Sequence, residues 1–282
     1  MLGQVDLFVH HTPLRQQLLD AQAERTRLGG VHSDLGHFAL QSIVGPLRSE
    51  AVVLRSLRYG EADRILHLYT PMRGRVGAIA KGVRRTRSRF GGRLEPFTHA
   101  DLQLHEGRSD LLTVTGADTI HAHARLRDDA AALDAAGRAC DAVSRLFETG
   151  DPHPEVFHLL CNELRLLEAG PARATLANQL AFRLKLLVAA GFGPQLSACA
   201  SCGEREHLFG FSGAAGGVVC EACEASAFPL DEEAHGFMVE ALGRPLAQAP
   251  DAQLRALRQV ERAITELAEH HGHVRLRAAA AG

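Results

Sequence analysis

The chain has 282 residues, a length that fits two domains or one large domain. Hydrophobic residues make up 46% of it, and no stretch approaches the roughly eighteen consecutive apolar residues of a transmembrane helix. The six cysteines are too sparse for a disulfide scaffold, and the N-terminus lacks the basic start and apolar run of a signal peptide. We therefore expect a globular protein that is neither membrane-embedded nor secreted.

The net charge of −2 conceals an uneven distribution. Residues 50–127 carry fourteen positive and eight negative side chains, whereas residues 128–282 carry thirteen positive and twenty-one negative. Such asymmetry indicates a polyanion-binding module joined to a part that must not bind polyanions or that binds another partner. Almost all the cations are arginines, which suit phosphate recognition, but a GC-rich genome explains the overall bias better.

Residues 1–48 show no stable periodicity. Leu14, Leu18 and Leu19 suggest one short helix, but Gly29-Gly30 and Gly45-Pro46 interrupt any longer element. We expect these residues to form a mobile, disordered extension without a function of its own, or to follow a start codon assigned too far upstream.

From residue 49 the pattern becomes that of short β-strands. Five are predicted, around residues 51–54, 64–70, 75–80, 97–105 and 111–115, with turn residues between them. Five strands at roughly ten-residue spacing predict a Greek-key barrel of the oligonucleotide/oligosaccharide-binding (OB) type over residues 49–127. An SH3-like barrel fits the same pattern.

After Arg125 the apolar residues recur with the period of a helix. Helices are predicted over residues 128–148, 173–190, 231–248 and 251–270, and another between the breaks at residues 151–154 and 169–171. They predict an all-α domain over residues 128–282 that is interrupted once, between residues 199 and 223. The expected fold class is therefore α+β, an OB-type barrel followed by a helical domain.

The interruption contains two Cys-x-x-Cys pairs, Cys199 with Cys202 and Cys220 with Cys223, separated by seventeen residues. Each pair supplies two thiolates from one tight turn, and two pairs complete a tetrahedron around Zn²⁺. Four protein thiolates leave no open coordination position, so we predict a structural zinc ribbon rather than a catalytic site. A redox pair or four unrelated thiols are the alternatives.

No acidic residue occurs between Arg64 and Leu94, and the cations are densest over residues 81–93, after the third predicted strand. A flexible cationic loop on a small barrel can follow a phosphate backbone, and an aromatic ring can stack on a base. The predicted DNA-binding residues are Arg64, Lys81, Arg84, Arg85, Arg87, Arg89, Phe90 and Arg93. A solvated loop, or one that meets an acidic protein, fits the same run of charge.

No catalytic centre is evident, and we expect that the protein is not an enzyme. The Gly-x-x-x-x-Gly-Lys-Ser/Thr phosphate loop is absent. Asp101, Asp110 and Asp118 are scattered over predicted strands and hairpins, so a carboxylate cluster for Mg²⁺ is not expected. Surface positions are predicted for His121 and His123 and for the C-terminal histidines, and buried positions for the thiols of Cys140 and Cys161.

Several short stretches follow one another in a specific order. They are Tyr59–Ile65, Lys81–Arg85 with Ser88-Arg89, Leu94–Phe97, Phe182–Lys185 and Gly191–Pro194, and they lead into the cysteine pairs. Together they resemble RecO, a family of bacterial recombination-mediator DNA repair proteins. The resemblance covers about residues 49–275 and leaves residues 1–48 outside.

The resemblance implies an OB barrel, a helical domain and zinc-binding cysteines that some members have lost. It implies binding to single- and double-stranded DNA and annealing of complementary strands without ATP, in agreement with the missing phosphate loop. The implied partners are RecR, single-strand-binding protein and, indirectly, the recombinase RecA. The implied location is the bacterial cytoplasm, near the nucleoid.

Two other classes stay open at this point. One is a zinc-ribbon adaptor whose basic loop binds an acidic partner protein. The other is an enzyme that acts on nucleic acid, such as a nuclease.

Overall fold

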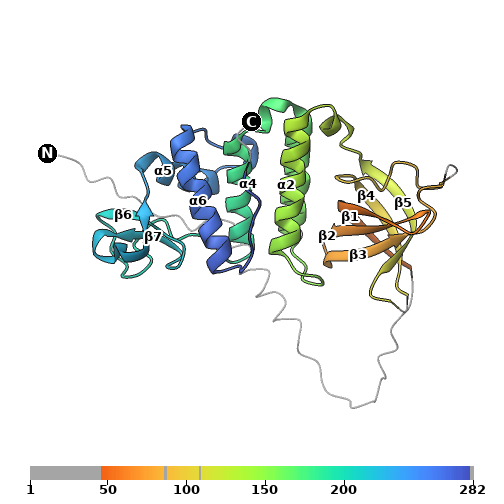
Figure 1. Ribbon diagram of the computed structural model, residues 1–282, viewed down its shortest axis with the longest axis horizontal. Helices are drawn as coiled ribbons and strands as arrows, with labels where there is room; N and C mark the ends of the chain where they lie inside the picture. Colours follow the sequence, from red (N-terminus) through yellow and green to blue (C-terminus); the bar gives the residue numbers. More distant parts are fainter. Residues whose placement is uncertain (1–45, 86–87, 108, 280–282) are drawn as a thin grey trace, which may run out of the picture. The chain divides into compact units, whose positions relative to one another are not determined.

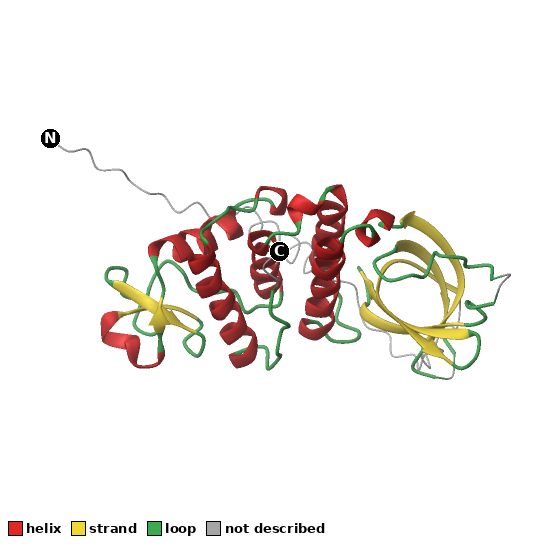
Figure 2. Cartoon of the chain, turned by 45° about the horizontal axis from the view of Figure 1, so that its top comes forward, coloured by secondary structure: helices red, strands yellow, loops and turns green. Residues whose placement is uncertain are grey.

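Five strands build the N-terminal part of the described chain. The structure, a computed structural model, describes residues 46–85, 88–107 and 109–279. The strands close into a barrel in the order β1-β2-β3-β5-β4 (Figure 2), with β3 and β5 parallel and the other neighbours antiparallel. Their bounds are β1 (Pro46–Tyr59), β2 (Asp63–Thr70), β3 (Gly74–Ala80), β4 (His99–His105) and β5 (Leu112–His121).

The first strand is longer than the sequence predicts. It has fourteen residues and pairs with β4 along its first half and with β2 along its second half. It begins at Pro46, three residues inside the segment that we assigned to an extension. The reason is that Leu47 lies opposite Leu104 and packs against the barrel interior. The rest of that segment, residues 1–45, lies outside the described residues.

The alternation of side chains in β1 serves two cores at once. Ala51 and Val53 point into the barrel, whereas Val52 and Leu54 belong to the core of the helical region. All four are buried. A strand that is covered on both faces reads as a continuous apolar run, which is the pattern that the sequence shows here.

Five helices of three turns or more make up the described helical region (Figure 1). Side-chain caps begin three of them: Asp129, Thr175 and Asp231 each accept a hydrogen bond from the backbone N–H three residues later. None of the described helices combines the length and the hydropathy that a membrane crossing needs. The helices are α2 (Ala130–Leu146), α3 (Pro154–Ala169), α4 (Leu176–Ala189), α5 (Glu232–Gly243) and α6 (Leu254–His270).

The barrel and the helices share buried contacts. Tyr69 of β2 meets Phe147 edge to face, with the ring centroids 6.1 Å apart, and His99 of β4 meets Phe157 of α3 at 5.4 Å. Arg75 of β3 donates to the carbonyl of Ser144 at 2.6 Å. The described chain from β1 onward is accordingly one compact unit rather than two independent ones.

The cysteine module is a small three-stranded sheet between α4 and α5. Its strands are β6 (Leu208–Ser212), β7 (Gly217–Cys220) and β8 (Phe228–Pro229), in the order β7-β6-β8. The antiparallel β6–β7 pair is the hairpin expected of a zinc ribbon. Contacts to α6 hold the module, because the Arg262 guanidinium lies 4.1 Å above the Phe228 ring and Glu266 accepts from the Gly213 N–H.

Candidate functional site

The two Cys-x-x-Cys pairs converge on one point. Their four Sγ atoms lie within 4.8 Å of one another, and those of Cys202 and Cys220 are 3.7 Å apart. Cys199 and Cys220 are buried, whereas Cys202 is exposed. The structure therefore brings together all four residues that the sequence singled out.

Backbone hydrogen bonds shape the first cysteine turn. Cys199 accepts from the N–H of Gly203 at 2.9 Å and donates its own N–H to Glu204 at 2.6 Å. Gly203 has a φ of +82°, which glycine adopts at little cost. A bond from the N–H of Ala200 to Val218, 2.8 Å long, fixes this turn against β7. The turn is thus set by its own backbone.

The donor set suits a soft divalent ion. Four thiols at this separation match the ligand number of a tetrahedral Cys₄ centre, and no histidine or carboxylate joins them within the described residues. With all four positions supplied by protein, such a centre has a structural role. Cys140 and Cys161 are buried elsewhere, as predicted, and burial raises the pKa of Cys161 to about 12.

The basic turn, which we define as residues 81–93, follows β3. Five of its six cations are described, and all five are exposed. None of the five forms an ion pair with a described residue. They are Lys81, Arg84, Arg85, Arg89 and Arg93, while Arg87 lies outside the described residues.

The basic turn is fastened to the turn between β1 and β2. The Gly82 N–H donates to the Asp63 carboxylate at 2.7 Å, and the Arg84 N–H donates to the carbonyl of Ala62 at 2.9 Å. The Arg84 guanidinium also lies 3.5 Å from the carbonyl oxygen of Gly60, which opens that turn. The two segments therefore form one surface at this end of the barrel.

Phe90 occupies a position different from the one the sequence suggested. Its side chain is 2% exposed and packs with Leu94 in the barrel core. The ring closes the barrel from inside the basic turn, and the Arg89 guanidinium lies over it at 4.8 Å. A ring in this position cannot stack on a base, so the stacking role predicted for Phe90 is wrong.

Arg64 is also placed differently from the other predicted cations. Its guanidinium donates to both carboxylate oxygens of Glu95 at 3.0 Å and to the Ser56 hydroxyl at 3.3 Å. Its side chain is only 23% exposed. The charge of Arg64 is therefore balanced locally, and the residue links β2 to Glu95, which follows the basic turn.

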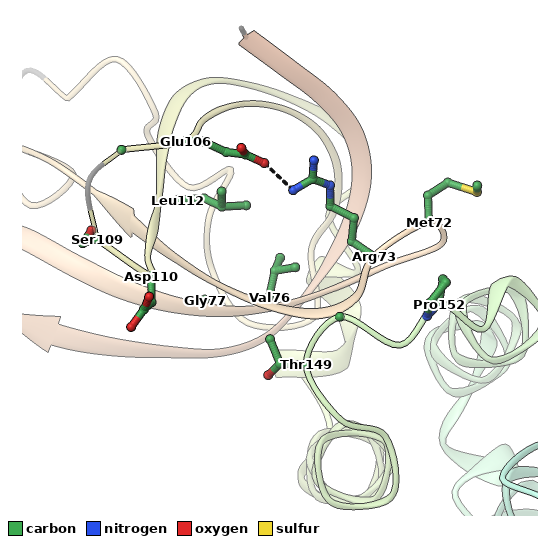
Figure 3. A pocket seen from close by; sticks show the side chains of 12 residues that line it. Met72, Arg73, Val76, Gly77, Glu106, Ser109, Asp110, Leu112, Thr149 and Pro152 are labelled. Carbon is green, nitrogen blue, oxygen red and sulfur yellow. Dashed lines mark hydrogen bonds and ion pairs between the residues drawn. The ribbon is translucent and has the colours of Figure 1, made fainter. Parts of the chain in front are cut away.

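A cleft of the barrel lies at the opposite end of β3. Its volume is about 490 Å³, and it opens between the β2–β3 turn, the β4–β5 loop and residues 149–152. Arg73 and Glu106 point toward each other across it and form an ion pair of 2.5 Å (Figure 3). Because Asp110 adds a further negative charge, this cleft does not suit a polyanion.

The acidic side chains are less scattered than the sequence indicates. Glu50, Asp101 and Asp118 are register partners in a row across β1, β4 and β5, whereas Asp110 lies in the cleft. Arg48 engages Asp101 at 2.6 Å. Within the described residues this row is not a cluster of metal-binding geometry.

Two of the histidines predicted at the surface, His121 and His123, stack in a row with His99 between the barrel and α3. We call these three residues the histidine ladder. The ring centroids of His99 and His121 are 6.3 Å apart, and those of His121 and His123 are 5.6 Å apart. His99 pairs with Glu50 and His123 with Glu168, each at 2.9 Å. The surface prediction is wrong for His123, which is 2% exposed, and correct for His121.

Comparison with known proteins covers both parts of the chain. The family model "Recombination protein O N terminal" matches residues 45–123, and "Recombination protein O C terminal" matches residues 127–278. The chain belongs to the RecO family. The first RecO match begins one residue before β1, and the second contains all five helices and the cysteine module.

Relatives of this RecO chain are similar over most of their length. The DNA repair protein RecO of Rubrobacter xylanophilus is 41% identical over 224 residues, 77% of this chain and 89% of the relative. That of Anaeromyxobacter sp. strain K is 38% identical over 228 residues, which are 78% of this chain and 89% of the relative. That of Nocardioides sp. is 43% identical over 194 residues, which are 66% of this chain and 78% of the relative.

Proposed function

We propose that this protein is a DNA repair and recombination mediator that binds single- and double-stranded DNA and anneals complementary strands without ATP. One observation carries the proposal. Five exposed cations at one end of the barrel have no carboxylate partner among the described residues, so their charge is available to an external polyanion. Membership of a family whose relatives are called DNA repair proteins supports DNA as that polyanion.

The barrel supports the same conclusion. Its strand order and its five strands agree with an OB-type barrel, a fold that binds oligonucleotides. We assign the exposed arginine and lysine side chains to phosphate contacts, which position DNA without reading its sequence. We therefore expect little sequence preference and strong dependence on salt.

Annealing follows from charge neutralisation. Two complementary strands repel each other through their phosphates, and a cationic surface that holds both lowers this repulsion. No step of this mechanism breaks or forms a covalent bond, so the proposal assigns the protein no catalysis.

The proposed partners come from the family resemblance. They are RecR, single-strand-binding protein and, indirectly, RecA, which the protein would help to load onto coated DNA. The acidic helical region, with its excess of Asp and Glu, is the part we assign to protein contacts. We assign the protein to the bacterial cytoplasm, close to the nucleoid.

The metal in the cysteine module is proposed to be Zn²⁺. Cys199, Cys202, Cys220 and Cys223 would hold it, and the ion would supply cross-links between the first cysteine turn and β7 rather than reactivity.

The test is annealing of complementary oligonucleotides coated with single-strand-binding protein, in the absence of ATP. The wild type is compared with a variant in which Arg84, Arg85 and Arg89 are Ala. In a control variant Arg165, Arg255 and Arg275, which are exposed on the helical region, are Ala. This variant loses the same number of positive charges. We expect acceleration by the wild type and the control, and a loss of rate with the first variant.

Binding to bare DNA is measured in parallel as a function of salt. Each lost phosphate contact reduces the slope of log K against log salt by about 0.7 to 0.9, so the first variant should show a flatter slope. An unchanged slope would show that the basic turn is not the interface. DNA binding without annealing would contradict the mediator role, and nuclease-insensitive binding of an acidic protein without DNA affinity would favour the adaptor.

A further inference from the structure

The four sulfur atoms of the cysteine module are not equally accessible. Cys202 is exposed and Cys223 is half-buried, whereas Cys199 and Cys220 are buried. Coordination to a metal keeps a cysteine in the thiolate form, which is its nucleophilic form. A small oxidant that arrives from solvent therefore meets the sulfur of Cys202 first.

A second sulfur lies within reach of Cys202. The Sγ atoms of Cys202 and Cys220 are 3.7 Å apart. A disulfide bond is about 2.0 Å long, so the two atoms have to approach each other by less than about 2 Å. Cys202 lies in a turn, whereas Cys220 ends β7 and is paired with Leu208 of β6. We therefore expect the turn residue to move and the strand residue to stay in place.

The other two cysteines of the chain provide a contrast. Cys140 on α2 and Cys161 on α3 are buried in the core of the helical region, and burial raises the pKa of both thiols. A thiol with a raised pKa stays protonated and reacts slowly with oxidants. These two residues are thus an internal reference for any oxidation at the module.

We infer that Cys202 is an oxidation site for hydrogen peroxide and that Cys220 is its resolving partner, which makes the cysteine module a redox switch. The Cys202 thiolate attacks one oxygen of the peroxide, the O–O bond breaks, and a sulfenic acid and a hydroxide ion form. The Cys220 thiolate then attacks the sulfenic sulfur, the S–S bond forms, and a second hydroxide leaves. Two electrons pass from the two sulfurs to the peroxide. The inference rests on the proposed zinc centre, which loses two of its four ligands in this reaction.

The position of the module decides what the switch changes. Cys199, Val219 and Cys220 form a small core of their own, whereas Val218 belongs to the core of the helical region, so the two cores meet at β7. Loss of two ligands loosens the small core and, through β7, the packing of the helices. The basic turn is fastened elsewhere, to Asp63 and its neighbour on the barrel. Oxidation should therefore lower thermal stability and leave DNA affinity unchanged.

The first experiment follows the metal. The whole protein, with its zinc content established beforehand, is treated with hydrogen peroxide, and free zinc is detected with 4-(2-pyridylazo)resorcinol. We expect release at a rate proportional to the peroxide concentration. Dithiothreitol followed by fresh zinc should restore the centre, because a disulfide is reversible. Retention of zinc, or irreversible oxidation to sulfinic acid, would overturn the switch.

A second experiment locates the new bond. After peroxide treatment the protein is alkylated in denaturant and digested without reduction. Trypsin cleaves after Lys185 and after Arg205, so the two Cys-x-x-Cys pairs lie on separate peptides. A disulfide between Cys202 and Cys220 joins these peptides, whereas a disulfide within one pair leaves them apart. We expect joined peptides, with both thiols of the helical core alkylated. Separate peptides would overturn the assignment.

A pair of variants tests the role of the exposed ligand. Cys202→His gives a Cys₃His ligand set, which binds zinc but lacks the sulfur that peroxide attacks. We expect zinc release from it to be slower by roughly tenfold or more. Cys223→His is the matched control, because it keeps Cys202 and Cys220, and it should release zinc as the wild type does. Equal rates in the two variants would contradict the inference. If Cys202→His holds no zinc, the peptide map of the wild type decides.

The outcomes separate this inference from the proposals on which it rests. A protein purified without metal would show that the zinc centre itself is wrong. Zinc that is present but resists peroxide would overturn the switch alone. Thermal unfolding and oligo(dT) binding are then compared before and after release, at a temperature where both forms are folded. We expect a lower unfolding temperature and an affinity within about twofold, because the phosphate contacts remain. Equal unfolding temperatures would contradict the coupling through β7.

Discussion

The cysteine module and the basic turn arrange their functional atoms in opposite ways. In the module, four sulfur atoms converge to within 4.8 Å, and their backbone is held by short hydrogen bonds. On the basic turn, five cations diverge into solvent without a described ionic partner. A convergent site depends on every member, because the loss of one ligand leaves the metal ion with an incomplete coordination shell. A divergent site acts through summed charge and loses affinity in steps.

The largest loss of stability is expected from a substitution in the cysteine module, which is the convergent site. Cys202→Ser should abolish tight metal binding and lower the free energy of unfolding by about 5 kcal/mol or more, the range seen when a structural metal is lost. Because Cys202 is exposed, lost packing does not account for such a change. The measurements are the metal content of the purified protein and its thermal unfolding. Cys140→Ala, at a buried thiol outside the module, is the control and should keep the metal. Full stability of Cys202→Ser after loss of the metal would contradict the structural role.

A smaller loss of stability is expected at Phe90, the fully buried phenylalanine of the basic turn. Phe90→Ala should lower the free energy of unfolding by about 3–4 kcal/mol, since it leaves a cavity in the barrel core. At a temperature where the variant is folded, its oligo(dT) affinity should stay within about twofold of the wild type, because the five exposed cations remain. Phe209→Ala, at a phenylalanine 37% exposed in the module, is the matched control for stability. A loss of DNA affinity without a loss of stability would show that the Phe90 ring contacts DNA.

The smallest effect is expected from the histidine ladder, which joins the barrel to α3. Burial lowers the pKa of His99 and of His123, although Glu50 and Glu168 partly oppose this. A depressed pKa means that the folded state favours the neutral ring. Its contribution to stability is complete above the unfolded value of about 6.5 and declines as the pH falls from there through the folded pKa.

Thermal unfolding at pH 7.5 and pH 5.5 checks this sign. The wild type should lose stability at the lower pH, and His123→Gln should lose less of it. The control is His158→Gln, on the exposed side of α3, which should follow the wild type. The pKa of His153 is raised, because Asp151 and Glu155 outweigh the effect of burial, so that residue acts in the opposite direction. A wild type more stable at pH 5.5 would mean that His153 outweighs the ladder.

Local patterns predicted much of this architecture. The five strands and five helices follow from apolar periods of two and of 3.6 residues, and the cysteine cluster follows from the spacing of two pairs. In each case the information lies within a few residues of the feature. The start of β1 was missed because its first residues depend on pairing with β4, more than fifty residues away.

The errors concern side chains whose partners are distant in the sequence. Arg64 looks like one more cation until Glu95, thirty-one residues later, is placed against it. His123 is buried by a partner forty-five residues away. Phe90 sits among arginines and glycines, and the one hint of its burial is Leu94, four residues on. The charge of the basic turn was therefore predictable, whereas the directions of its side chains were not.

The contacts between barrel and helices decide how this chain can be dissected. A fragment that ends at Arg127 would expose Val52, Leu54 and Tyr69, which pack against the helices in the whole chain. The complementary fragment would lose the cover over Phe147 and Phe157. Both pieces would display a contiguous apolar patch of the kind that drives self-association. Division of the chain between the two family matches should thus give aggregates rather than folded domains. The whole chain is therefore the unit to purify.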